Sequence, residues 1–191
     1  MAQGLVFDCD GHLLERQQDV RKYLEAPWDK RPTSLWPSGD QPWDTELFGT
    51  LEGGYKSGLS PAEQVEIWLS MMDQENMETA VLFPSGSGNA AKLSERNFAA
   101  AVCRACNTHF AKEYNALSDR IHAVGVLPLR QPEEAAKELR RAVTEEGLVS
   151  FELLSLGLPL ALGDPIYDPV YEAAEELGVP LCIHGNRNTA H

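Results

Sequence analysis

The feature that most constrains the fold is a regular alternation of short apolar segments with longer helical segments. The apolar segments are rich in β-forming residues and stop at turn-forming residues, which predicts strands at 5–9, 79–83, 121–127, 148–154 and 180–184. Apolar spacing, with proline near the starts and glycine after two of the ends, predicts helices over about 61–76, 93–117, 131–147 and 170–177. This order is typical of parallel strands joined by right-handed helical crossovers.

Two α/β architectures are compatible with this order, an open doubly wound sheet and a (β/α)₈ TIM barrel. Periodicity alone leaves both open. No G-x-G-x-x-G follows the first predicted strand, which weakens the dinucleotide-binding version of the open sheet. Five strands complete an open sheet, whereas a barrel needs eight strands and typically about 250 residues. The 191 residues therefore form either one open-sheet domain or one incomplete barrel.

One segment departs from the alternation, a long insertion at 16–59 after the first predicted strand. It contains three of the four tryptophans, Trp28, Trp36 and Trp43, interspersed with prolines. A connection of this length is either functional or disordered, and the aromatic residues favour an ordered lid at the carboxyl end of the strand. The alternative is a surface loop that has an aromatic cluster of its own.

The charge balance excludes several classes of partner. The net charge is −13, from 29 acidic and 16 basic residues. Nucleic acids and anionic membranes need clustered Lys and Arg, so we expect neither as a partner. Neither a secretory signal nor a membrane-spanning segment is predicted, and four cysteines do not form a disulfide scaffold. We therefore expect a cytoplasmic protein.

The most informative motif is Asp8-Cys9-Asp10-Gly11-His12, with Glu15 just beyond it. In an extended strand, alternate residues share one face, so Asp10 and His12 can place a carboxylate oxygen and an imidazole nitrogen on one cation. Gly11 lets the backbone turn closely there. The alternative is that Asp10 caps a turn and His12 is an ordinary surface residue.

A third candidate ligand, His184, ends the last predicted strand and is followed by Gly185. In a barrel, residues at the carboxyl ends of strands form the active site. Together with Asp10 and His12, His184 would complete three nitrogen and oxygen ligands with an open position, as in catalytic Zn²⁺ or Mn²⁺ sites.

The pattern Asp8-x-Asp10-x-His12-x-x-Glu15 resembles the strand-one metal motif of the amidohydrolase superfamily. More narrowly, it is similar to the amidohydrolase-related group that contains aminocarboxymuconate-semialdehyde decarboxylase and the resorcylate-type decarboxylases. Residues 163–185 resemble the passage from helix four to strand five of that group. The resemblance implies a TIM barrel truncated after about five βα units. It also implies that Asp10 and His12 are the strand-one metal ligands and that His184 is the strand-five ligand.

The family also uses a histidine after strand six and an aspartate after strand eight. His191 ends the chain just after the fifth predicted strand, so we expect both groups to be absent and leave the catalytic residues unknown. The resemblance implies a metal-dependent hydrolase or decarboxylase acting on a small carboxylated compound, for which an aromatic ring is one option. Zinc is the expected metal, with manganese second. Candidate substrate-binding residues are Asn186, Arg187 and Trp43.

The alternative function is a catalytically silent half-barrel that binds a partner or forms a homo-oligomer through its open strand edges. Three weaker features remain. The Cys103-x-x-Cys106-x-x-His109 spacing resembles half a zinc site, but we interpret it as helix packing. Glu152 either faces the site or pairs with a cation, and the loop 85–88 either contacts an anion or a substrate or is an ordinary loop.

Overall fold

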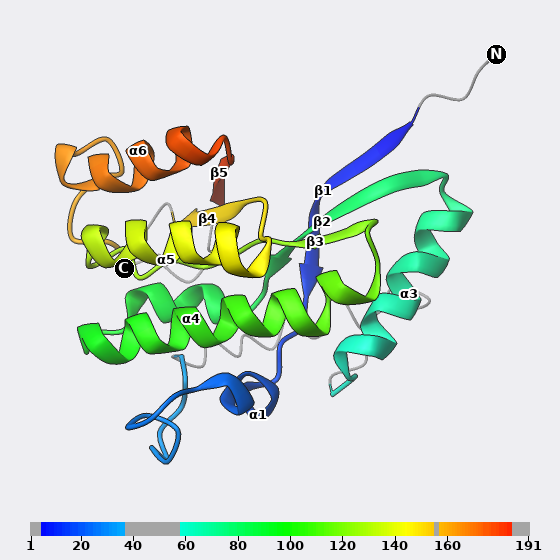
Figure 1. Ribbon diagram of the computed structural model, residues 1–191. Coiled ribbons are helices and arrows are strands. Elements are labelled where there is room, and N and C mark those ends of the chain that lie inside the picture. Colours follow the sequence, from blue (N-terminus) through cyan, green and yellow to red (C-terminus); the bar gives the residue numbers. More distant parts are fainter. Residues whose placement is uncertain (1–4, 37–57, 155–156, 185–191) are drawn as a thin grey trace.

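A computed structural model describes residues 5–36, 58–154 and 157–184 of the chain (Figure 1). All five predicted strands and all four predicted helices are present within these ranges. The strands are β1 (Val6–Leu13), β2 (Met77–Pro84), β3 (Ile121–Ala123), β4 (Phe151–Leu154) and β5 (Leu181–His184). The helices are α1 (Gln17–Val20), α3 (Pro61–Gln74), α4 (Arg96–Glu113), α5 (Pro132–Glu146) and α6 (Asp168–Leu177), with short 3-10 turns η1 (Arg21–Tyr23), η2 (Ser87–Lys92), η3 (Asn115–Leu117) and η4 (Pro165–Tyr167).

The strands run parallel and follow one another in sequence order. One sheet has the order β1-β2-β3 and a second pairs β4 with β5. A parallel bridge between Gly125 and Phe151 joins them, since the Gly125 N–H donates to the Ser150 carbonyl and the Gly125 carbonyl accepts from the Glu152 N–H. A doubly wound sheet reverses its strand order near the middle, and no reversal occurs among the described strands. The topology is therefore that of the first five strands of a barrel.

Local sequence signals account for the helix boundaries. The Ser60 hydroxyl accepts from the Glu63 N–H while the Glu63 carboxylate accepts from the Ser60 N–H, so a capping box opens α3. Helices α5 and α6 end at Gly147 and Gly178, whose φ angles of 74° and 66° favour glycine. Tyr114, with φ −123° and ψ −65°, ends α4 earlier than predicted.

Two strands differ in length from their predictions. β1 continues to Leu13, four residues past its predicted end, because its second half pairs with β2 up to Pro84. β3 ends at Ala123 rather than at 127. Beyond it, Val124 still donates to the Leu82 carbonyl, so this part of the chain remains between its two neighbouring strands.

The core lies between the strands and the helices that cover their outer side. Helices α4, α5 and α6 lie side by side in this layer (Figure 1). The largest fully buried apolar side chains come from both layers and include Leu82, Phe110, Ile121, Leu139 and Phe151. No described helix is both long enough and apolar enough to cross a membrane.

The described part of the insertion, residues 16–36, packs against the body of the domain. Trp28 lies 5.5 Å from the Phe98 ring of α4 between centroids, and the Arg31 guanidinium lies 4.3 Å above the same ring. Trp36 is buried, and a Cβ at Gly86 would lie 2.9 Å from its indole nitrogen. These aromatic contacts anchor the described part of the insertion on the rest of the domain, and both the lid and the surface loop with its own aromatic cluster stay predictions.

Candidate metal centre

A β-bulge shapes the end of β1. Asp8 is opposite Ala80 and Gly11 is opposite Leu82, so β1 carries one residue more than β2 over this interval. The Asp8 carboxylate accepts the Asp10 N–H at 3.1 Å. Strict alternation therefore does not hold from residue 8 to 12. Residues 8–12 belong to a bulged strand and not to a turn, so Asp10 does not cap a turn as the alternative interpretation had it.

Gly11 allows the two sides of the bulge to close. A Cβ on this residue would lie 2.5 Å from Leu82 Cδ2 and 2.5 Å from Trp68 Cη2, closer than side chains tolerate. The backbone thus rests directly on side chains of β2 and α3. This contact fixes the strand from which Asp10 and His12 project.

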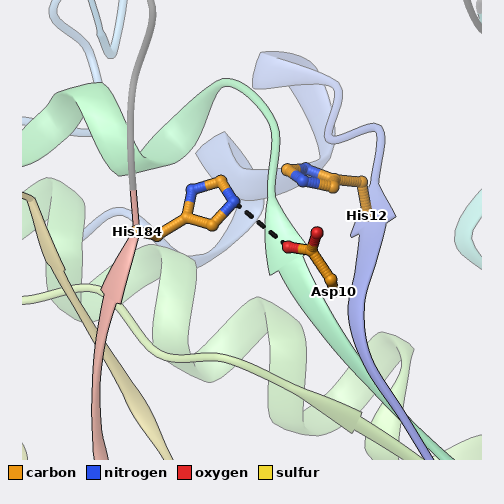
Figure 2. A group of neighbouring side chains, drawn as sticks. All are labelled: Asp10, His12 and His184. Atoms are coloured by element: carbon orange, nitrogen blue, oxygen red, sulfur yellow. Dashed lines mark ion pairs between the residues drawn. The ribbon is translucent and has the colours of Figure 1, made fainter.

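Asp10, His12 and His184 converge at the carboxyl ends of β1 and β5 (Figure 2). One ligand atom from each lies within 4.8 Å of the others, and His184 Nε2 is 3.5 Å from Asp10 Oδ1. In a flat sheet, strands separated by four steps of about 4.8 Å would stand about 19 Å apart. The strands therefore curve as in a barrel. Within the described residues, these three form the metal-type group of His, Cys, Asp or Glu side chains.

The His12 side of the group is braced by the loop after β2. Ser85 Oγ lies 3.3 Å from His12 Nδ1. The same loop donates to Glu15, through the backbone N–H groups of Ser85, Gly86 and Ser87 and through the Ser87 hydroxyl. Burial raises the pKa of Glu15, and these hydrogen bonds oppose the rise. The anion that this loop contacts is thus the chain's own carboxylate, a role that the sequence had not assigned to Glu15.

The His184 side is braced by β2 and β4. The imidazole stacks on Phe83, with 4.5 Å between ring centroids and 19° between planes. His184 Nδ1 lies 3.5 Å from Oε1 of Glu152, which is buried on β4. Glu152, and then Asp10, raise the pKa of His184, while partial burial opposes them. Glu152 thus faces the site and also interacts electrostatically with Lys92, so both roles left open for it are compatible with the structure.

The remaining candidates fall into two groups. Cys103, Cys106 and His109 are buried on α4, so their spacing reflects helix packing as expected. Burial raises the pKa of both thiols well above their usual value. The candidate substrate-binding residues Trp43, Asn186 and Arg187 lie outside the described residues and stay predictions, as does the insertion between 37 and 57.

Comparison with known proteins matches residues 7–191 to the Amidohydrolase family. Among curated relatives, the gamma-resorcylate decarboxylase of Rhodococcus jostii (strain RHA1) is 34% identical over 128 residues, covering 62% of this chain and 39% of that protein. The match confirms the resemblance drawn from the strand-one motif and from residues 163–185.

Solved structures agree with this assignment at the level of the fold. The 2,6-dihydroxybenzoate decarboxylase from Rhizobium aligns with a TM-score of 0.67 at 22% identity, over 98% of this chain and 52% of that chain. A dihydroxybenzoic acid decarboxylase from Polaromonas sp. JS666, solved with manganese and 2-nitroresorcinol, aligns with a TM-score of 0.66 at 20% identity, over 98% and 51%.

The chain spans about half the length of these solved relatives. Its α/β fold of parallel strands and alternating helices matches half of their TIM barrel, which confirms the predicted fold class. The family match over 185 residues, the strand order and the side chains grouped at the carboxyl ends of β1 and β5 all agree. This chain belongs to the amidohydrolase family.

Proposed function

We propose that the chain carries part of the metal site of a divalent-metal-dependent decarboxylase of small aromatic carboxylates. The observation that carries this proposal is the convergence of Asp10 and His12 from β1 with His184 from β5. Relatives named as decarboxylases of gamma-resorcylate and 2,6-dihydroxybenzoate support the reaction and the substrate class. They favour decarboxylation over the hydrolysis that the sequence had left equally open.

The donor set fits a divalent cation. One carboxylate and two imidazoles are ligands that both zinc and manganese accept, and three of them leave positions for a substrate. The Asp10 side chain is 82% exposed, so the group opens to solvent on the side where a substrate would arrive. The sequence favoured zinc, but the solved Polaromonas relative holds manganese, and we therefore propose manganese as the first metal to test.

Each of the three residues has a separate part in the proposed site. When bound, the cation would act as a Lewis acid toward a carboxylate or phenolic oxygen of the substrate. Asp10 supplies negative charge that offsets the cation, while His12 and His184 supply neutral donors. Stacking against Phe83 restricts rotation of the His184 ring, and the Ser85 hydroxyl restrains His12. Ordered ligands lose less entropy when they close on a cation.

The test is manganese binding by the 191-residue chain, measured by equilibrium dialysis with elemental analysis, followed by assay of CO₂ release from 2,6-dihydroxybenzoate. We expect one manganese per chain in the wild type and loss of that metal in His12→Ala and in His184→Ala. His122→Ala is the matched control, because His122 lies on β3 outside the group and should leave metal content unchanged. A wild-type chain that binds neither manganese nor zinc would refute the proposal.

That negative result would favour the alternative, a silent half-barrel that associates with itself. One observation supports this alternative: apolar side chains are exposed on the two outermost described strands, with Phe7 59% and Ile183 69% exposed. Light scattering on the metal-free chain, combined with the manganese-binding measurement, separates the two functions. A stable dimer without metal supports the self-associating module, whereas a metal-binding monomer supports the enzyme site.

A further inference from the structure

We propose that Glu152 is a positioning residue for His184, holding the imidazole proton on Nδ1 so that Nε2 is presented to the cation. The inference deepens the proposed function, because it concerns the same site and assumes that His184 is a ligand. Metal-bound histidines commonly donate their second ring N–H to a carboxylate, which fixes both the tautomer and the ring orientation. Glu152 lies beside Nδ1 of His184, the position that such a carboxylate would occupy.

The two nitrogens of the His184 ring face two different carboxylates. Nδ1 lies 3.5 Å from Glu152 Oε1. Nε2 lies 3.5 Å from Asp10 Oδ1, and this ion pair is the dashed line in Figure 2. A neutral imidazole carries a single N–H, so only one carboxylate can accept from it. The tautomer therefore depends on which of the two carboxylates costs more free energy when it accepts no hydrogen bond from His184.

Burial of Glu152 favours the tautomer in which His184 donates its N–H to Glu152. The Glu152 side chain is 4% exposed, while that of Asp10 is 82% exposed and is solvated by water. The second oxygen of Glu152, Oε2, is buried and accepts no hydrogen bond within the described part of the chain. A buried carboxylate without donors costs far more free energy than an exposed one. The Nδ1–H tautomer thus removes the larger penalty.

The fold also prevents Glu152 from turning away. β4 and β5 pair in parallel, with Glu152 opposite Cys182 and Leu154 opposite His184, and the Glu152 N–H donates to the Gly125 carbonyl at 2.8 Å. Glu152 Oε2 packs so closely against Gly88 that a Cβ there would lie 2.5 Å from it. The strand pairing therefore fixes the Glu152 backbone, and the contact with Gly88 holds the carboxylate beside His184 Nδ1.

A purely structural role would instead have Glu152 balance the charge of Lys92. The two groups interact electrostatically, since Glu152 opposes the lowering of the Lys92 pKa that burial causes. Replacing Lys92 by Met removes this interaction and leaves the Glu152–His184 contact in place. Lys92→Met is therefore the matched control that separates charge balance from positioning.

The experiment records long-range ¹H–¹⁵N correlations of the histidine rings in the metal-free 191-residue chain, at a pH where His184 is neutral, with His184→Gln used for assignment. We expect the Nδ1–H tautomer in the wild type and in Lys92→Met. Glu152→Gln should retain it through the amide oxygen, and Glu152→Leu should lose it. Unchanged thermal unfolding in Glu152→Gln, the isosteric variant, keeps the result interpretable if Glu152→Leu folds poorly.

Manganese binding by the same variants supplies the second readout. Loss of an outer partner of a metal-bound histidine weakens metal binding by about 10- to 100-fold, which we expect for Glu152→Leu, with a smaller loss for Glu152→Gln and none for Lys92→Met. Manganese binding by a wild type whose His184 carries the proton on Nε2 would overturn the inference alone. An Nδ1–H tautomer without metal binding would support positioning by Glu152 and refute the proposed function.

Discussion

Acid should destabilise this protein through His109, which lies in α4 with no exposed surface. Its ring packs among Tyr23, Phe110 and Tyr114, at centroid distances of 5.9, 6.0 and 5.5 Å. Neither ring nitrogen has a hydrogen-bond partner in the described structure. Burial lowers the pKa of His109 from 6.5 to about 4, although the nearby Glu113 carboxylate opposes the change.

The sign of the effect follows from which state of the protein, folded or unfolded, is protonated first as the pH falls. As the pH falls below 6.5, His109 is protonated in the unfolded chain but stays neutral in the folded protein until the pH approaches about 4. Its contribution to stability is thus fully present above pH 6.5 and is lost as the pH falls toward about 4. The difference between the two pKa values corresponds to roughly 3 kcal/mol of unfolding free energy.

The assay is urea unfolding of the wild type and of His109→Leu at a series of pH values from about 7 to about 4. Leucine keeps an apolar side chain at this position and removes the titrating group. The wild type should lose roughly 3 kcal/mol more than the variant over this range. Parallel pH profiles would refute the argument, as would a His109 imidazole that titrates near 6.5 in the folded protein by NMR.

Three further changes probe packing and buried charge by urea unfolding. Gly11→Ala should lower the free energy of unfolding by about 1–3 kcal/mol and weaken manganese binding. Gly163→Ala is the control, because nothing lies within 4 Å of its added Cβ and neither property should change. Equal effects of the two substitutions would contradict the bulge geometry. Arg141→Ala should cost about 1.5–3 kcal/mol, because the buried Glu138 loses two charge-assisted hydrogen bonds but keeps Arg104 and Asn107 as partners, and a loss below about 1 kcal/mol would contradict this. Glu15→Ala should cost more than about 2 kcal/mol because it removes the acceptor for three backbone N–H groups, and unchanged stability would show that water replaces it.

The elements could be predicted from sequence because their signals are local. The Ser60 capping box, the glycines that end α5 and α6, and the short β-rich segments act within a few residues of where they stand. Asp10, His12 and His184 could likewise be selected, because each stands at the end of an apolar strand and has a side chain that binds metals. The resemblance to the amidohydrolase superfamily added the assignment of these residues to the first and fifth strands of a barrel.

The partners of these residues could not be predicted, because they depend on contacts between distant segments. Glu15 meets the loop after β2 across about 70 positions of the chain, and Glu152 meets His184 only because β4 pairs with β5 in one register. The bulge that places Asp10 and His12 depends on the pairing of β1 with β2 and on the packing of Trp68 against Gly11. None of these contacts has a local sequence signal.

By itself the sequence determined which segments become strands and helices, and which side chains could bind a metal. Only the tertiary structure decided that β1 and β5 curve toward each other, so that one carboxylate and two imidazoles stand within 4.8 Å. It also decided which buried carboxylate faces which ring nitrogen. The physical reason is that propensity and capping are local energies, whereas curvature and burial arise from the packing of all the strands and helices together.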